Sequence, residues 1–204
     1  AFMWCRAVEQ ITFHDVTPAE NGVSKVLGEL TQELETEIFF TDGMQVRLTF
    51  PEYYEEAVEN TPARILFTQH HGTGNNYRQC FYNKEMDYRK YDELFVLAKA
   101  QDKQEVLVDM VFNRLEYPYD LTDKNKDEYK DYMLEHFAQW SEILVEQDAI
   151  KRLQFLSKQN LWSREMLDIA IMEASEKKRG ETLSFLMNEK QSLYPKRKKK
   201  TFEL

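Results

Sequence analysis

Hydrophobic positions in the first third of the chain follow two different periods. Residues 8–16 alternate loosely between apolar and polar and predict a strand that ends at Thr17-Pro18. Residues 18–35 carry apolar side chains three and four apart and predict a helix, with Thr17 as its N-cap and Pro18 in its first turn.

The clearest pattern in the sequence is a β-hairpin. Two strand-like segments, 37–40 and 44–50, flank a turn at Thr41-Asp42-Gly43. Asp-Gly favours the positive φ angles that a tight hairpin needs. Strict alternation predicts that one set of side chains faces a core and the other set faces outward. The inward set is Met44, Val46, Leu48 and Phe50. The outward set is Gln45, Arg47 and Thr49.

A short acidic helix is expected at 52–59 and a further strand at 64–68, so the first third predicts a small α+β unit. Residues 70–88 have no sustained period and are rich in turn-forming residues, which indicates a boundary. The predicted organisation is an α+β unit at 1–75, a linker at 76–90, a helical domain at 91–194 and a basic tail at 195–204.

Helix-forming residues dominate after the linker, and their apolar side chains predict six helices in three consecutive pairs. The pairs are 91–100 with 104–115, 129–147 with 149–158, and 164–177 with 181–191. Leu153-Gln-Phe-Leu156 and Leu183-Ser-Phe-Leu186 match at a 30-residue offset. We expect these four leucines to share one continuous core.

Similarity at such a period, in units of two helices, is typical of stacked helical arrays. In residues 94–108 a short apolar helix with a central alanine leads into a second apolar helix. Residues 91–192 therefore resemble degenerate ankyrin-type repeats, although the Thr-Pro-Leu-His opening and the glycine turns are missing. The resemblance implies an array whose surface binds another protein. A plain helical bundle is the alternative fold.

The charge of the chain disfavours some partners. It holds 27 Lys and Arg against 36 Asp and Glu, a net charge of −9. An acidic body repels nucleic acid and anionic lipid. No stretch approaches 18 consecutive apolar residues, so neither a transmembrane helix nor a membrane partner is expected. Contact with nucleic acid is expected only through the basic residues of the tail, Lys196, Arg197, Lys198, Lys199 and Lys200.

The two cysteines, Cys5 and Cys80, are too few for a disulfide framework and too far apart for a zinc site. We expect free thiols and a cytoplasmic location. The chain opens at Ala1 with an apolar run and no signal-peptide pattern. This opening suggests that the sequence is the C-terminal part of a longer protein.

Two pairs of adjacent residues that contain histidine are candidates for catalysis. His70-His71 follow one predicted strand and His14-Asp15 end another. If the strands are neighbours, these residues can converge as metal ligands or as an acid and a base. Adjacent residues of a strand point to opposite faces, which opposes a shared role for His70 and His71. The glycines at 72–76 lack the Lys-Ser/Thr of a phosphate-binding loop, so a turn is expected and no cofactor is predicted.

Aromatic residues make up 13% of the chain. Tyrosines in predicted loops suit a contact surface, because their rigid rings lose little entropy on binding. The candidates for partner binding are Tyr77, Tyr82, Tyr88, Tyr117 and Tyr119.

The sequence therefore favours a protein–protein interaction module without catalytic activity. The alternative hypothesis is a metal-assisted hydrolase or nuclease that uses His14, Asp15, His70 and His71.

Overall fold

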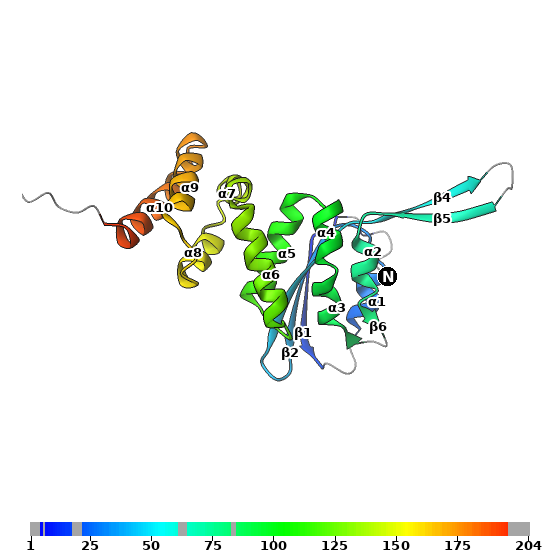
Figure 1. Cartoon of the computed structure of the whole chain (residues 1–204). Helices are drawn as coiled ribbons and strands as arrows, with labels where there is room; N and C mark the ends of the chain where they lie inside the picture. Colours follow the sequence, from blue (N-terminus) through cyan, green and yellow to red (C-terminus); the bar gives the residue numbers. More distant parts are fainter. Residues whose placement is uncertain (1–4, 6, 18–21, 61–64, 83–84, 196–204) are drawn as a thin grey trace, which may run out of the picture. The chain divides into compact units, whose positions relative to one another are not determined.

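A computed structural model shows an α+β protein with strands in the N-terminal part and helices in the rest, as the sequence predicted (Figure 1). It describes residues 5, 7–17, 22–60, 65–82 and 85–195. The chain divides into two compact units, residues 1–131 and 132–204.

The first unit is built on a three-stranded sheet of β1 (Gln10–Val16), β2 (Leu34–Phe40) and β3 (Gln45–Phe50). β1 runs parallel to β2, and β2 and β3 form the expected antiparallel hairpin. Gly43 in its turn has a φ of +85°. The inward set is confirmed for Val46, Leu48 and Phe50, which are buried. The prediction that Met44 faces the core is wrong: this residue precedes β3 and its side chain is half exposed.

Thr49 belongs to the outward set of β3 and is nevertheless buried. The hydroxyl of Tyr91, in α3 (Tyr88–Glu93), donates to the Thr49 carbonyl at 2.6 Å and accepts from its N–H at 3.1 Å. The Asn113 amide, in α5 (Gln104–Glu116), donates to Thr49 Oγ1 at 3.0 Å. Helices that the sequence placed in another domain therefore cover the edge of β3.

Two predicted helices of the first unit differ from the structure. The helix expected at 18–35 is the short α1 (Val23–Gly28), because Leu34 already belongs to β2; residues 18–21 lie outside the described part. The helix at 52–59 is wrong. Its residues form β4 (Tyr54–Asn60), which pairs antiparallel with β5 (Ile65–His71). The β-favouring run at the start of β5 supplies the partner that makes this segment a strand.

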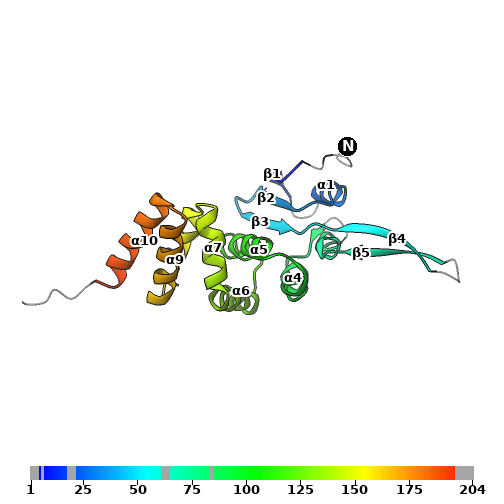
Figure 2. The ribbon, with the colours of Figure 1, turned by 90° about the horizontal axis from the view of Figure 1, so that it is seen from above.

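The described residues of the expected linker, 76–82 and 85–90, form short helices and strands of the first unit. They include most of α2 (Gly74–Arg78), then β6 (Phe81–Tyr82), β7 (Glu85–Met86) and the start of α3. The division of the chain falls after Asp131 instead. The reason is that α5 packs along β3, which Figure 2 shows, so the first helix pair joins the sheet in one core.

A buried ion pair ties the helices of the first unit together. Arg114 in α5 donates to both carboxylate oxygens of Asp92 in α3, at 2.7 and 2.8 Å, and both side chains are fully buried. Tyr129 in α6 (Asp123–Glu135) donates to the same carboxylate at 2.9 Å. These hydrogen bonds compensate the desolvation of the two charges. Between α3 and α5 lies α4 (Phe95–Gln101).

The second unit holds two helix pairs: α7 (Phe137–Glu146) with α8 (Ile150–Lys158), and α9 (Arg164–Glu176) with α10 (Gly180–Leu193). The helix predicted at 129–147 is divided at His136 into α6 and α7.

The 30-residue period is visible in the turns of the two pairs. Asp148 and Lys178 have positive φ angles of 47° and 56°. In each turn the next N–H bonds a carbonyl five residues back, over 2.9 Å in both cases. Leu153, Leu156 and Leu186 are fully buried, while Leu183 is half-buried. α8 and α10 pack against each other, so the expected core is confirmed for three of the four leucines.

Truncating the buried leucines tests this core. Leu153→Ala, Leu156→Ala and Leu186→Ala should each lower the free energy of unfolding by about 2–5 kcal/mol, because each leaves a cavity. Leu183→Ala should cost less, because its side chain is only half-buried. Urea denaturation measures the differences. Losses below about 1 kcal/mol at the three buried positions would contradict the packing described.

Candidate functional site

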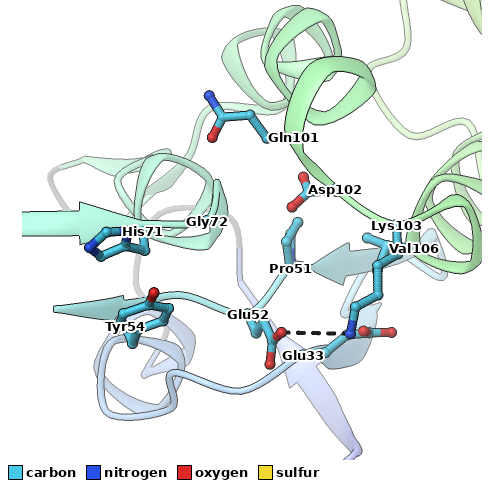
Figure 3. Close-up of a pocket in the computed structure, with 10 residues that line it drawn as sticks. All are labelled: Glu33, Pro51, Glu52, Tyr54, His71, Gly72, Gln101, Asp102, Lys103 and Val106. Atoms are coloured by element: carbon cyan, nitrogen blue, oxygen red, sulfur yellow. Dashed lines mark ion pairs between the residues drawn. The ribbon is translucent and has the colours of Figure 1, made fainter.

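A pocket of about 150 Å³ lies in the first unit at the base of the ribbon formed by β4 and β5 (Figure 3). We call residues 54–60 and 65–71 the β4–β5 ribbon. Its lining offers carboxylates, an imidazole and an ammonium group, and none of the lining residues is a serine or cysteine. The residues are Glu33, Pro51, Glu52, Tyr54, His71, Gly72, Gln101, Asp102, Lys103 and Val106.

The base of the ribbon is fixed by Arg78 of α2, whose side chain is buried. Its guanidinium donates to the carbonyls of Leu27 at 3.2 Å, Gln32 at 2.7 Å, Pro51 at 2.7 Å and Gly74 at 3.0 Å. One planar fork thus joins four separate backbone positions. No sequence pattern singled out this residue, because it lies within the turn-rich segment.

The Arg78 guanidinium also lies over two rings, 5.0 Å from the centroid of Tyr53 and 5.7 Å from that of Phe50. Burial lowers the pKa of Arg78 to about 10. The group therefore stays protonated at neutral pH, and all its donors remain available to the carbonyls.

The glycine run 72–76 brings two chain segments close together. Gly72 has a φ of +81°, and a Cβ there would lie 2.5 Å from the Glu52 carbonyl oxygen. A Cβ on Gly74 would lie 2.1 Å from the Pro51 oxygen. The turn predicted at 72–76 is limited to Gly72 and Thr73, because residues 74–76 belong to α2. The two glycines permit close backbone contact at the base of the ribbon.

Carboxylates determine the electrostatics of the pocket. Burial and the nearby Asp109 raise the pKa of Glu33. Burial also raises the pKa of Asp102, against a hydrogen bond from the Thr73 hydroxyl that lowers it. Lys103 Nζ lies 3.8 Å from the Glu52 carboxylate in an exposed pair. Such groups can hold a proton or a small polar molecule, but the lining supplies no activated nucleophile.

His14-Asp15 and His70-His71 lie in different sheets, so the assumption that their strands are neighbours is wrong. His14 on β1 stacks on Phe39, with ring centroids 5.0 Å apart. His71 on β5 stacks on Tyr54 at 4.5 Å, and its Nε2 lies 3.3 Å from Glu56. In the described part of the chain, no three His, Cys, Asp or Glu side chains are grouped as metal ligands. Asp15 follows His14 on β1, and His70 is paired by backbone register with Glu55.

For two of the five candidate tyrosines, the prediction that they contact a partner is wrong. Tyr77 and Tyr88 are buried within the first unit. Tyr77 packs on Tyr91 with ring centroids 4.8 Å apart, and Tyr88 packs on Tyr119 at 5.0 Å. The loops predicted there are short helices instead, which turn these rings into the core.

The remaining tyrosine candidates have mixed environments. Tyr117 is half-buried under the Arg47 guanidinium, 4.7 Å from the ring centroid. Tyr119 is half-buried and stacks on Phe40 at 4.6 Å. The side chain of Tyr82 lies outside the described part. The contacts of Tyr117 and Tyr119 stabilise the first unit, and partner binding by Tyr82, Tyr117 and Tyr119 stays a prediction.

In the second unit, exposed apolar side chains gather on the last helix pair. Met172 of α9 is 53% exposed and Met187 of α10 is 56% exposed. Leu193 and Tyr194, at the end of α10, are also largely exposed. The sequence contained one indication of this exposure, because Met172 lies outside the apolar stripe of its helix. Met187 lies on the predicted stripe of α10 and is exposed all the same.

The repeat places Met187 at a position that contacts a loop in the first pair. Its counterpart 30 residues earlier is Ser157 in α8, whose hydroxyl accepts a hydrogen bond from Trp162 Nε1 at 2.9 Å. In the first pair this position thus contacts the loop that leads into the next pair. In the last pair, Met187 stands at the same point with its side chain open to solvent.

Comparison with protein-family models, curated proteins and solved structures finds no match for this chain. Among the helices of the described residues, none is both long and apolar enough to cross a membrane.

Removing the Arg78 guanidinium tests its structural role. Arg78→Met should cost about 3 kcal/mol of unfolding free energy or more, because four carbonyls lose the charged donor that joins them, and three of these contacts are buried. Arg89→Met is the matched control: this arginine of α3 is exposed, and its pair with Asp120 is 3.6 Å long. Its effect should stay within about 0.5 kcal/mol. Equal effects of both variants in thermal or urea denaturation would contradict this role.

The two cysteines should differ in reactivity. Cys5 is exposed, whereas Cys80 is buried and burial raises the pKa of its thiol to about 12. Because the thiolate is the reactive form, a thiol reagent at pH 8 should modify Cys5 quickly and Cys80 only after denaturation. Mass spectrometry of the labelled peptides gives the result. Rapid native labelling of Cys80 would show that its surroundings open.

Proposed function

We propose that this protein is a non-catalytic interaction module of the cytoplasm, and that its second unit binds another protein through the last helix pair. The observation that carries this proposal is the exposed apolar group Met172, Met187, Leu193 and Tyr194 on α9 and α10. Methionine and tyrosine side chains are enriched in the interfaces of protein complexes.

The repeated geometry of the helix pairs supports the same function. Stacked helix pairs build extended surfaces that bind proteins, and their terminal pairs ordinarily have a polar outer face. Here the last pair exposes two methionines, whose flexible side chains adapt to varied partners. The proposal takes the second unit as an ankyrin-like array of two pairs.

Free thiols support the cytoplasmic location. Both cysteines are unpaired, and Cys5 is exposed, a state that a reducing compartment preserves. The hydrolase alternative loses its geometric basis, because His14 and His71 lie on strands of different sheets.

Site-specific crosslinking tests the proposal. A photoreactive amino acid at position 187 should crosslink the partner in cells, while the same group at position 44 should not. Met44 is a matched control, because it is an apolar side chain of similar exposure, 50% against 56%, in the first unit.

With the crosslinked protein identified and purified, titration gives the energetic contribution. Met187→Glu should weaken the dissociation constant at least about tenfold, and Met44→Glu by less than about twofold. Circular dichroism confirms that both variants are folded. Crosslinking of the same proteins from both positions, or equal affinities of both variants, would refute binding through this face.

A further inference from the structure

The β4–β5 ribbon has a fixed base and, within the described part of the chain, strands that pair only with each other. It forms a two-stranded sheet of its own. Figures 1 and 2 both show it extending away from the helices of the first unit. A two-stranded ribbon in water is marginally stable, and in the described part of the chain the outer edge of each strand pairs with no further strand. Such an edge can take a further strand.

The charge of the ribbon restricts the kind of strand that fits. β4 carries Glu55, Glu56 and Glu59, while neither β4 nor β5 contains a lysine or arginine. Because strand residues alternate between faces, Glu55 and Glu59 lie on one face and Glu56 on the other. A second acidic ribbon would place carboxylates against carboxylates. A basic strand would meet opposite charge on both faces.

The chain itself contains a segment of the required charge, the five consecutive basic residues 196–200. In extended form, three of these residues would lie on one face and two on the other. We propose that the β4 edge of one copy binds residues 196–200 of a second copy as an added strand. Reciprocal exchange of the two segments closes a two-fold dimer.

The fixed base of the ribbon favours this contact. Arg78 and the close approach of Gly74 to Pro51 hold the ends of both strands in place. A binding edge that is already ordered loses less conformational entropy on association. Exposed apolar side chains, Tyr54 at 61% and Leu66 at 72%, add area that a partner can cover. This contact does not depend on the function proposed for the second unit.

Sedimentation of the full chain across ionic strengths tests the exchange. The dimer should form at low salt and dissociate towards 1 M, where the Debye length is about 3 Å. E55Q/E56Q/E59Q should weaken dimerisation at least about tenfold. The control E165Q/E176Q/E181Q also removes three carboxylates, from exposed positions of α9 and α10. It should change the dissociation constant of the dimer by less than about twofold.

A mixing experiment identifies the segment that is bound. K196Q/R197Q/K198Q/K199Q/K200Q should be as monomeric as the ribbon variant. Mixing the two should restore association, because one ribbon and one basic segment remain intact in each mixed dimer.

Several outcomes would overturn the proposal. These are a wild-type chain that stays monomeric at low salt, equal weakening by the control variant, or dimerisation unaffected by neutralising residues 196–200. Protection of the β4 amides from exchange that does not depend on protein concentration would mean that the chain's own tail is bound. That result would rule out a second copy as the source of the bound segment. Binding of a basic partner protein in place of self-association would overturn the proposal too.

Discussion

The buried guanidinium of Arg78 is the interaction on which the first unit's most unusual feature depends. It joins the carbonyls of Leu27, Gln32, Pro51 and Gly74, which come from separate parts of the sequence. A buried charge without such partners would be strongly unfavourable, so the four carbonyls and the guanidinium require one another. The result is a rigid base from which the acidic β4–β5 ribbon extends.

The second unit follows a different physical rule. Its two helix pairs repeat one turn geometry 30 residues apart, and each pair buries the second leucine of the repeated motif, Leu156 and Leu186. A repeated unit of this kind presents a stacking face at its end unless polar residues cover that face. Met172 and Met187 are the large apolar side chains that the last pair exposes most. The two units therefore expose different chemistry, an acidic strand pair in the first and apolar side chains of a helix pair in the second.

Local periodicity was sufficient to predict the hairpin of β2 and β3 and the last helix pair, because those patterns repeat within a few residues. The helices predicted at 91–100 and 129–147 are each divided in two, into α3 and α4 and into α6 and α7. It failed at β4, where three glutamates resemble an exposed helix and only the partner strand makes the segment extended. The pocket could not be predicted, since its lining joins Glu33, His71 and Asp102 from distant positions. Arg78 gave no signal either, because its role depends entirely on carbonyls elsewhere in the chain.

The β4–β5 ribbon combines a fixed base with an outer edge that no further strand of the described chain covers, and residue-resolved hydrogen exchange measures both features in one experiment. In dilute protein, the Tyr53 amide, which donates to the Thr31 carbonyl at 2.8 Å, should exchange slowly. The edge amides of β4 should exchange quickly, because water is their only acceptor when the edge is uncovered. Slow exchange along the whole of β4 in a dilute monomer would contradict the account. So would fast exchange at Tyr53, because the base would then not be fixed.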